Sequence, residues 1–243
     1  MDGKTSLITG SAKRIGRQIA VSQAELGAEV VIHYRSSAEE AESLKEKLIS
    51  SGTAAWTAQA DFETESEYGN FFEEVREKAG NVDYLVNNAS IFPGGGLEEM
   101  TFEDLTRNIR VNSWAPLSLI RGFADHFSSG KIVNLLDTRV AGYDWEHAAY
   151  YLSKVLLARI TKMLAIKFAP GYTVNAVAPG LITPPEGLDQ SYLGERLDRV
   201  PLRRSGEKSD VARAVNFLLS SDFITGQIIY VDGGRNLLHE LEG

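Results

Sequence analysis

Short apolar runs alternate with longer amphipathic segments along nearly the whole chain. The runs are rich in β-branched residues, as in EVVIHY, KIVNLL and TVNAVAP, and they predict strands. The segments between them, such as AEEAESLKEKLIS and SDVARAVNFLLSS, place apolar residues at helical spacing. Because strands that are apolar at nearly every position need cover on both sides, the pattern predicts an α/β fold, a doubly wound parallel sheet with helices on both faces.

Nothing in the pattern divides the chain. No linker, repeat or low-complexity segment interrupts the alternation, so we expect a single domain over residues 1–243. The longest irregular stretch runs from about Pro179 to Arg204 and is rich in proline and glycine. A loop of this kind at the edge of a sheet is suited to covering a ligand.

Composition narrows the classes of function. With 43% hydrophobic residues the chain can bury one large core, and its formal charge of -8 argues against a general surface for nucleic acid or anionic membranes. Cysteine is absent and the four histidines show no ligand spacing, so we expect no metal site. We also expect a cytoplasmic protein, because the chain shows neither a leader segment nor an apolar run of membrane-spanning length.

A tyrosine and a lysine four residues apart are the first sign of chemistry. Tyr150 and Lys154 lie in the stretch HAAYYLSKVLLARITKMLAIKF, and a helix there places both side chains on one face. An ammonium beside a phenol favours phenolate, so we expect the pKa of Tyr150 to be lowered toward neutrality. The pair would then be an acid-base device, although a surface tyrosine beside a solvated lysine has the same spacing.

The first predicted strand runs directly into a glycine turn that suits a phosphate. Its residues, TGSAKRIG, lead into the first predicted helix, whose free amides and dipole favour a pyrophosphate. This position in an alternating chain predicts a Rossmann-type dinucleotide site. We expect the turn to bind the cofactor through Gly10, Ser11, Lys13, Arg14, Ile15 and Gly16.

The end of the second predicted strand indicates which dinucleotide binds. An NAD site usually has a carboxylate there, whereas this chain has Tyr34, Arg35 and Ser36. A guanidinium with hydroxyl donors, and Lys13 nearby, suits the 2′-phosphate of NADPH. We therefore expect NADPH rather than NADH, with a solvated arginine at the strand end as the alternative.

Together these residues resemble the short-chain dehydrogenase/reductase family over essentially the whole chain. The motifs fall in the family's order: the glycine turn, Asn87-Asn88-Ala89, Asn112, the Tyr150/Lys154 pair, Pro179-Gly180 and Asp232-Gly233-Gly234. The resemblance implies that Lys154 also binds the nicotinamide ribose and that Asn112 supports a proton relay. It further implies cofactor contacts from Asp61 and its neighbour Phe62, and from Asn88, Ala89, Ser90, Pro179, Gly180 and Ile182.

Four departures from the general pattern resemble the pteridine reductases and the related dihydromonapterin or dihydrofolate reductases. They are Arg14 in the glycine turn, Ser90, Phe92, and Asp137, which stands where a serine is usual. In those enzymes the arginine and serine contact substrate and cofactor, and the phenylalanine stacks on the pterin. The resemblance implies a pterin-like substrate held by Arg14, Ser90, Phe92, Asp137 and Tyr150, and a homodimer or homotetramer.

The chemistry of Asp137 agrees with a pterin. A carboxylate opposes a developing alkoxide, which a serine hydroxyl would stabilise, so Asp137 suits ketone reduction poorly. If its surroundings hold it protonated, it can join Tyr150 in delivering a proton to a ring nitrogen. We therefore expect an NADPH-dependent oxidoreductase that transfers hydride to a dihydropteridine, dihydromonapterin or dihydrofolate, with Asp137, Tyr150, Lys154 and Asn112 as catalytic residues.

The sequence leaves other interpretations open. Phe92 could cap its loop against the core, Asp137 could bind backbone amides at the strand end, and Arg14 could pair with an acidic helix residue. The protein could also be a carbonyl reductase acting on a 3-oxoacyl thioester, a ketone or a sugar, or it could bind NADPH without turnover. The presence of the proton-relay residues argues against the last alternative.

The helix that carries Tyr150 is apolar on two faces. One face would pack against the sheet and the other against a second subunit, although a fully buried helix would show the same pattern. The first face is Leu157, Ile160, Leu164 and Phe168, and the second is Leu152, Leu156, Met163 and Ile166.

Overall fold

A computed structural model describes residues 1–64, 67–185 and 187–238 of the chain. Within these ranges seven parallel strands form one sheet in the order β3-β2-β1-β4-β5-β6-β7. The order reverses between β1 and β4, which makes the sheet doubly wound. The bounds are β1 Thr5–Ile8, β2 Glu29–Tyr34, β3 Ala55–Gln59, β4 Tyr84–Asn87, β5 Gly130–Leu135, β6 Tyr172–Pro179 and β7 Ile228–Val231.

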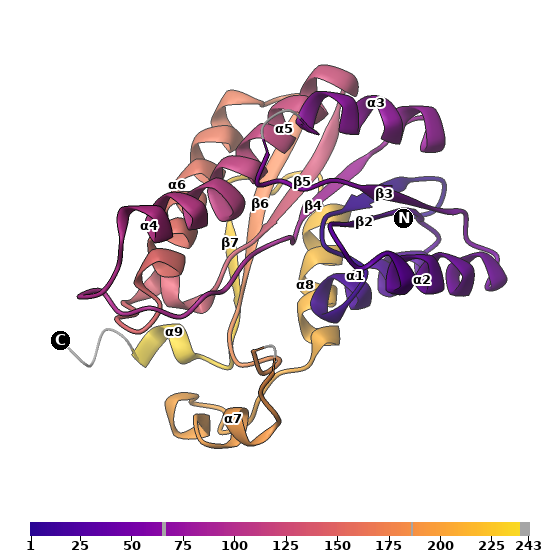
Figure 1. Ribbon diagram of the computed structural model, residues 1–243. Coiled ribbons are helices and arrows are strands. Elements are labelled where there is room, and N and C mark those ends of the chain that lie inside the picture. Colours follow the sequence, from indigo (N-terminus) through magenta and orange to yellow (C-terminus); the bar gives the residue numbers. More distant parts are fainter. Residues whose placement is uncertain (65–66, 186, 239–243) are drawn as a thin grey trace.

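Helices cover both faces of the sheet (Figure 1), so the predicted α/β fold is confirmed. One layer holds α1 (Arg14–Glu25), α2 (Ala38–Ser50) and α8 (Lys208–Ser220). The other layer holds α3 (Glu67–Ala79), α5 (Ala115–His126) and α6 (Ala148–Lys167).

The two cores follow from the alternation of side chains along each strand. In β1, Leu7 packs beneath the layer of α3, α5 and α6, and its neighbour Ile8 packs beneath α1, α2 and α8. Both side chains are fully buried. Because both faces of the central strands are covered, these strands have no polar face, and their sequences are therefore apolar runs.

The helical stretch that follows Thr101 is divided into three parts. Helix α4 (Phe102–Ile109) is followed by a π-helical turn, η1 (Arg110–Trp114), and then by α5. Pro116 stands in the first turn of α5 and has no N–H to donate to the carbonyl of Asn112 four residues back. The wider turn lies at this point and carries the buried side chain of Asn112.

The irregular stretch after β6 lies at the carboxyl edge of the sheet, as predicted. We call residues 180–185 and 187–204 the β6–α8 loop; it carries α7 (Ser191–Gly194) and η3 (Leu197–Arg199). Figure 1 shows it beyond the ends of β6 and β7, at the same end of the molecule as α9 (Arg235–Leu238). Leu181, Leu193 and Val200 form a small apolar cluster within the loop. The loop is therefore a packed structure placed over the edge where such sheets bind ligands.

Two kinds of feature are absent from the described ranges. None of their helices is both long enough and apolar enough to cross a membrane. Nor do those residues bring three or more histidine, aspartate or glutamate side chains together where a metal ion could be held.

The two-layer packing predicts a large difference between two leucine substitutions. Leu119 on α5 is 1% exposed, whereas Leu26 at the end of α1 is 48% exposed. We expect Leu119→Ala to lower the free energy of unfolding by about 2–5 kcal/mol, because it removes buried contacts and leaves a cavity. Leu26→Ala should change it by about 0.5 kcal/mol or less. Urea unfolding followed by circular dichroism measures both, and equal losses would contradict this packing.

Candidate functional site

A cleft opens along the carboxyl ends of the central strands. Its cavity of about 430 Å³ extends from the glycine turn after β1 to the Tyr150/Lys154 pair on α6. Segments far apart in the sequence meet here, as they do at the ligand sites of doubly wound sheets. Most residues predicted for cofactor and substrate line it: Gly10, Lys13, Arg14, Ile15, Gly16, Tyr34, Arg35, Ser36, Asp61, Phe62, Asn88, Ala89, Ser90, Phe92, Tyr150, Lys154 and Pro179.

Other predicted cofactor residues support the cleft without lining it. Ser11 is fully buried and donates its hydroxyl to the carbonyl of Ile8 at 2.7 Å, so its side chain turns away from a cofactor. Ile182 is 7% exposed and packs in the core beside α8. Gly180 lies against Asp232, where an added Cβ would come within 2.6 Å of the aspartate Cβ.

The glycine turn is closely packed and leaves amides free. Gly10 has a φ of +61°, and a Cβ on Gly16 would lie 2.4 Å from the Gly10 carbonyl oxygen, so both positions require glycine. Helix α1 begins at Arg14 with no side-chain cap on its first amides. These amides stand at the positive end of the helix dipole, so the residues present fit the pyrophosphate of a dinucleotide.

Asn88 fastens this turn to the end of β4. Its Nδ2 donates to the carbonyl oxygens of Thr9 and Gly10 at 2.9 and 3.0 Å. In return, Thr9 Oγ1 accepts from the backbone amides of Asn88 and Ala89, both at 2.9 Å. Besides lining the cleft, Asn88 and Ala89 therefore hold the turn in position.

His33, on β2, supports the glycine turn. The histidine spacing in the sequence did not indicate this role. The Gly10 amide donates to His33 Nδ1 at 2.9 Å, so the ring hydrogen is assigned to Nε2, which lies 3.1 Å from the Ala60 carbonyl. The ring stacks on Phe62 at 4.3 Å. Burial lowers the pKa of His33 to about 4, so the ring is neutral. The available signal was a histidine inside the apolar run EVVIHY.

The predicted 2′-phosphate residues lie at the end of β2. Lys13 Nζ pairs with Glu40 at 2.7 Å, and Arg35 Nη1 lies 3.9 Å from Glu63. Both cations are about half exposed, so these ion pairs are weak and screened by solvent. A phosphate can therefore compete for either cation.

Tyr150 and Lys154 lie one helical turn apart on α6, and both are buried. Burial raises the pKa of Tyr150 well above its ordinary value, and the nearby Asp137 adds to the effect. The predicted lowering is therefore wrong for this arrangement. Lys154 Nζ donates to the Leu135 carbonyl at 2.9 Å and lies 5.7 Å from the centre of the Tyr150 ring. Burial also lowers the pKa of Lys154 to about 8.

Asp137 meets hydrogen-bond donors on both oxygens. Tyr150 Oη donates to Oδ2 at 3.1 Å, and Arg139 Nη1 lies 3.3 Å from the same oxygen. The Arg139 backbone amide donates to Oδ1 at 2.9 Å. Asp137 thus binds a backbone amide, which was the alternative, and also contacts the Tyr150 phenol, while its predicted part in proton delivery stays a prediction. These contacts make Asp137 an acceptor, which does not support the hypothesis that its surroundings hold it protonated.

Arg139 links Asp137 to a second carboxylate. Its Nε lies 2.8 Å from Asp144 Oδ2, and the same oxygen is 3.2 Å from His147 Nδ1. Burial opposes ionisation of Asp144, but the His147 hydrogen bond and the Arg139 charge hold the pKa of Asp144 below its usual range. No motif pointed to Arg139, because only the fold turns its side chain back toward Asp137.

Phe92 lines the cleft above this network. Its ring stacks on His147 at 4.4 Å and meets Tyr150 edge-on at 4.6 Å, with the Arg139 guanidinium 5.1 Å from its centre. The ring therefore partly caps the neighbouring loop, which was the alternative role. Because His147 occupies one face and the Arg139 guanidinium also lies over the ring, the predicted stacking of a pterin on Phe92 stays a prediction.

Asn112 ties the loop after β4 to α6. Its Oδ1 accepts from Ser90 Oγ and from the Ile91 amide, both at 2.9 Å, and its Nδ2 donates to Ser153 Oγ at 3.0 Å. No hydrogen bond between Asn112 and Lys154 occurs among the described residues. Asn112 thus positions Ser90, and its predicted part in a proton relay stays a prediction.

Arg14 connects the glycine turn to the β6–α8 loop. Its Nη2 donates to Thr183 Oγ1 at 2.8 Å and to the Pro184 carbonyl at 2.6 Å. In the described part of the chain Arg14 forms no ion pair with an acidic helix residue, which was the alternative. Arg14 lies on the cavity wall, and its contacts with substrate and cofactor stay a prediction.

Comparison with known proteins gives a matching family model and several similar reductases. A family model described as enoyl-(acyl carrier protein) reductase matches residues 10–236. The 3-oxoacyl-[acyl-carrier-protein] reductase FabG of Staphylococcus epidermidis is 34% identical over 239 residues, which cover 95% of this chain and 98% of the relative. Versicolorin reductase 1 of Aspergillus parasiticus is 34% identical over 255 residues, covering 96% of this chain and 97% of the relative.

Solved structures match over the same extent. FolM alternative dihydrofolate reductase 1 from Brucella suis, in complex with NADP, superposes with a TM-score of 0.92 at 32% identity and covers 97% of this chain and 96% of that one. A short-chain dehydrogenase from Burkholderia cenocepacia, also with NADP, gives 0.90 at 33% identity, with 97% and 98% covered. The similarity therefore includes the cleft and α6.

The buried His33 predicts a pH dependence of stability. Its ordinary pKa is 6.5 and its pKa in the folded protein is about 4. As pH falls through this window the unfolded chain binds a proton that the folded chain does not, so stability is lost; above pH 6.5 the effect vanishes. Between pH 7 and 4.5 we expect the parent to lose about 2–3 kcal/mol more than His33→Asn.

His33→Asn is the matched variant because its side-chain oxygen can still accept from the Gly10 amide while it cannot titrate. Urea unfolding of both proteins at the two pH values measures the difference. The same pH dependence in parent and variant would show that His33 does not remain neutral in the fold.

Proposed function

Because the chain belongs to the short-chain dehydrogenase/reductase family, we propose that it is an NADPH-dependent reductase of a pterin-like heterocycle, such as a dihydropteridine, dihydromonapterin or dihydrofolate. The names of its relatives support the coarser part, an oxidoreductase that uses NADP. The choice of a pterin is carried by one observation, the contact between Asp137 and the phenol of Tyr150.

NADPH, when bound, supplies the hydride. The free amides at the start of α1 would hold its pyrophosphate beside Gly16. Arg35 and Lys13 would hold the 2′-phosphate, since both are accessible at the end of β2. Lys154 would bind the nicotinamide ribose through its buried amine on the cavity wall.

Tyr150 is suited to donating a proton. Because burial raises its pKa, the phenol keeps its proton at neutral pH and can release it only to a strong acceptor, such as a ring nitrogen that gains charge as hydride arrives. Asp137 fixes the direction of the phenol through the 3.1 Å hydrogen bond. A protonated Lys154 stabilises the phenolate that forms, and with a pKa of about 8 it carries that charge at neutral pH.

An acceptor carboxylate beside a donor phenol favours a substrate with N–H groups. The amino group and ring N–H of a pterin can donate to Asp137 while another ring nitrogen accepts from Tyr150. Carbonyl reduction instead builds negative charge on oxygen, which the Asp137 carboxylate would repel. This assignment keeps Tyr150 as the proton donor and makes Asp137 the group that orients both phenol and substrate.

Carbonyl reduction is the second candidate, because the FabG and versicolorin reductase relatives are each 34% identical to this chain. It predicts activity on 3-oxoacyl thioesters or ketones and a dispensable carboxyl at position 137. Binding of NADPH without turnover fits the site less well, since a binding protein has no use for a buried phenol and amine beside a cofactor cleft.

Substitution of Asp137 distinguishes pterin reduction from carbonyl reduction. With NADPH and a panel of dihydropterins and acetoacetyl thioesters, we expect Asp137→Ser to lower kcat for dihydropterins by about 100-fold and to raise activity on simple ketones. Tyr150→Phe should lower kcat by about 100- to 10,000-fold on any substrate while NADPH still binds. Oxidation of NADPH followed at 340 nm, together with fluorescence titration of NADPH, measures both effects.

The matched control is Asp125→Ser, because Asp125 is exposed on α5 and lies outside the cleft lining. It should leave every rate unchanged. If Asp137→Ser reduces dihydropterins as fast as the parent does, the carboxyl has no role and carbonyl reduction becomes the better assignment.

We also propose that the protein forms a homodimer or homotetramer through α6. Leu157 and Leu164 on its inner face are 1% and 8% exposed, whereas Met163 and Ile166 on its outer face are 68% and 82% exposed. The fully buried helix, which the sequence left open, is therefore excluded. An apolar face of this kind commonly meets a second subunit.

Light scattering tests this assembly. We expect a mass of at least twice the 26.7 kDa of the chain at micromolar concentration, and we expect Ile166→Asp to shift it toward the monomer because it buries a charge in the interface. Leu26→Asp, at an exposed position on α1, is the control. A parent protein that is monomeric at these concentrations would contradict the assembly.

A further inference from the structure

Arg235 begins α9 at a point where three parts of the substrate end of the fold meet. It follows the turn Asp232-Gly233-Gly234, and Asp232 accepts a hydrogen bond from Thr138, which lies between Asp137 and Arg139. The β6–α8 loop packs against the same turn, where the Leu202 amide donates to the Gly233 carbonyl at 3.2 Å. Helix α9 also contacts η2 (Thr138–Ala141). Arg235 is thus held between the proton-donor end of the cleft and the loop that covers it.

The guanidinium of Arg235 has no partner among the described residues. It forms neither a hydrogen bond nor an ion pair with them, although the side chain is half-buried. Burial lowers the pKa of Arg235, and the charge of Arg139 lowers it further, while Asp137 opposes the change. An arginine in this position is short of a negative neighbour.

Two further arginines lie near Arg235. The guanidiniums of Arg139 and Arg199 both repel that of Arg235. The carboxylates facing them are Asp137 and Asp144, and both are already bound by Arg139. Neither carboxylate pairs with Arg235, whose guanidinium is therefore available to hold a carboxylate or phosphate with two hydrogen bonds.

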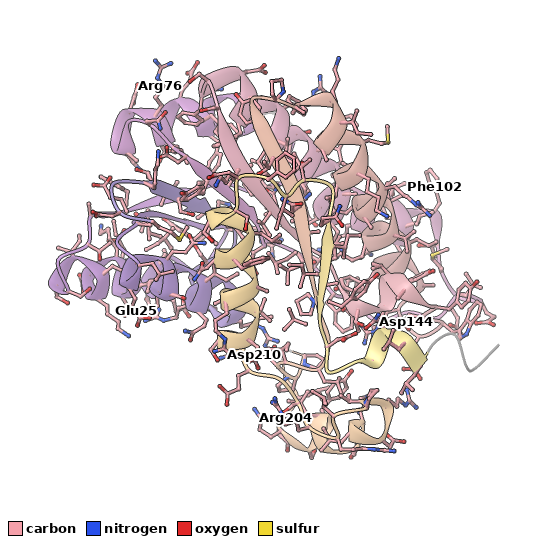
Figure 2. All side chains as sticks on the ribbon, turned by 180° about the vertical axis from the view of Figure 1, so that it is seen from behind. Glu25, Arg76, Phe102, Asp144, Arg204 and Asp210 are labelled. Atoms are coloured by element: carbon pink, nitrogen blue, oxygen red, sulfur yellow. The ribbon has the colours of Figure 1, made fainter. Side chains whose placement is uncertain are left out.

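We propose that Arg235 binds an anionic group, a carboxylate or a phosphate, on the side arm of the substrate, with Arg139 and Arg199 adding positive charge around it. The inference rests on the proposed reduction at Tyr150, because it places the anion beyond a ring held against Asp137. Figure 2, seen from behind, shows Asp144 beside α9 and Arg204 on the β6–α8 loop, both at this end of the molecule. The proposed subsite therefore lies between η2 and the β6–α8 loop, next to the residues that line the cavity and not among them, whereas the 2′-phosphate residues lie at the end of β2.

Three pterins that differ in one substituent test the proposal. The probes are the neutral 6-hydroxymethylpterin, its phosphate ester and 6-carboxypterin. Each is titrated into the complex of the protein with NADP⁺, which has no hydride to transfer, so that binding is measured without turnover. The parent should bind at least one of the two acids more tightly than the neutral pterin, and the acid that it prefers identifies carboxylate or phosphate as the ligand group.

Arg235→Ala should weaken binding of the preferred acid by about tenfold or more, because a charge-assisted pair is lost, and change binding of the neutral pterin less than about twofold. Arg235→Lys should restore part of the affinity, since it keeps the charge and loses the fork geometry. The control is Arg76→Ala, because Arg76 is exposed at the opposite end of the molecule (Figure 2). Unchanged affinity for NADP⁺ confirms that each variant is folded.

The outcomes separate the subsite from the proposed function. If Arg235→Ala weakens acid and neutral pterin equally, or neither, the subsite is overturned while pterin binding stands. If the parent binds no pterin, the proposed function fails, and the subsite is decided with acetoacetate and its neutral ethyl ester in NADPH oxidation. In that assay Arg235→Ala must raise the KM for acetoacetate and leave the KM for its ethyl ester unchanged. If the variant changes both KM values equally, or neither, the subsite is overturned.

Discussion

Loss of water around Tyr150 and Lys154 is the constraint on which the chemistry of this protein depends. Burial disfavours the charged form of both groups, so it raises the pKa of the phenol and lowers that of the amine to about 8. Lys154 makes no hydrogen bond to the phenol oxygen, because its amine donates to the Leu135 carbonyl of β5. Other polar groups must therefore hold the phenol in position. Asp137 does so through its hydrogen bond with Tyr150, and Arg139 in turn pairs with Asp137.

Local pattern predicted the fold because each strand and helix is determined mainly by its own periodicity. Local pattern did not predict the features that depend on a single residue or on contacts between distant parts of the chain. Pro116 lies in a stretch with a helical pattern and can stand in the first turn of a helix. Its missing N–H coincides with the π-helical turn that carries Asn112. The sequence placed Asp137 beside Tyr150 correctly, but its role as an acceptor follows from Arg139, and the direction of that side chain is set only by the folded loop.

The relatives show why overall similarity cannot choose the substrate. A FabG reductase at 34% identity and a FolM structure at 32% identity both cover this chain almost completely. A fold shared at this level fixes the cofactor cleft, whereas specificity depends on a few side chains at loop ends. In this chain the residues that we propose for this role are Phe92, Asp137 and Arg235, and the choice between a ketone and a pterin must be argued from their charges and hydrogen bonds.

The bonds that fasten the glycine turn to β4 bear on how the cleft forms during synthesis. Asn88 reaches Thr9 across 79 positions of sequence, and Lys154 closes the cleft from much further along the chain. A nascent chain that ends before α6 has the phosphate turn but not its far wall. NADPH can therefore stabilise this protein only after most of the chain has left the ribosome, and until then the first half must rely on its own apolar burial or on chaperones.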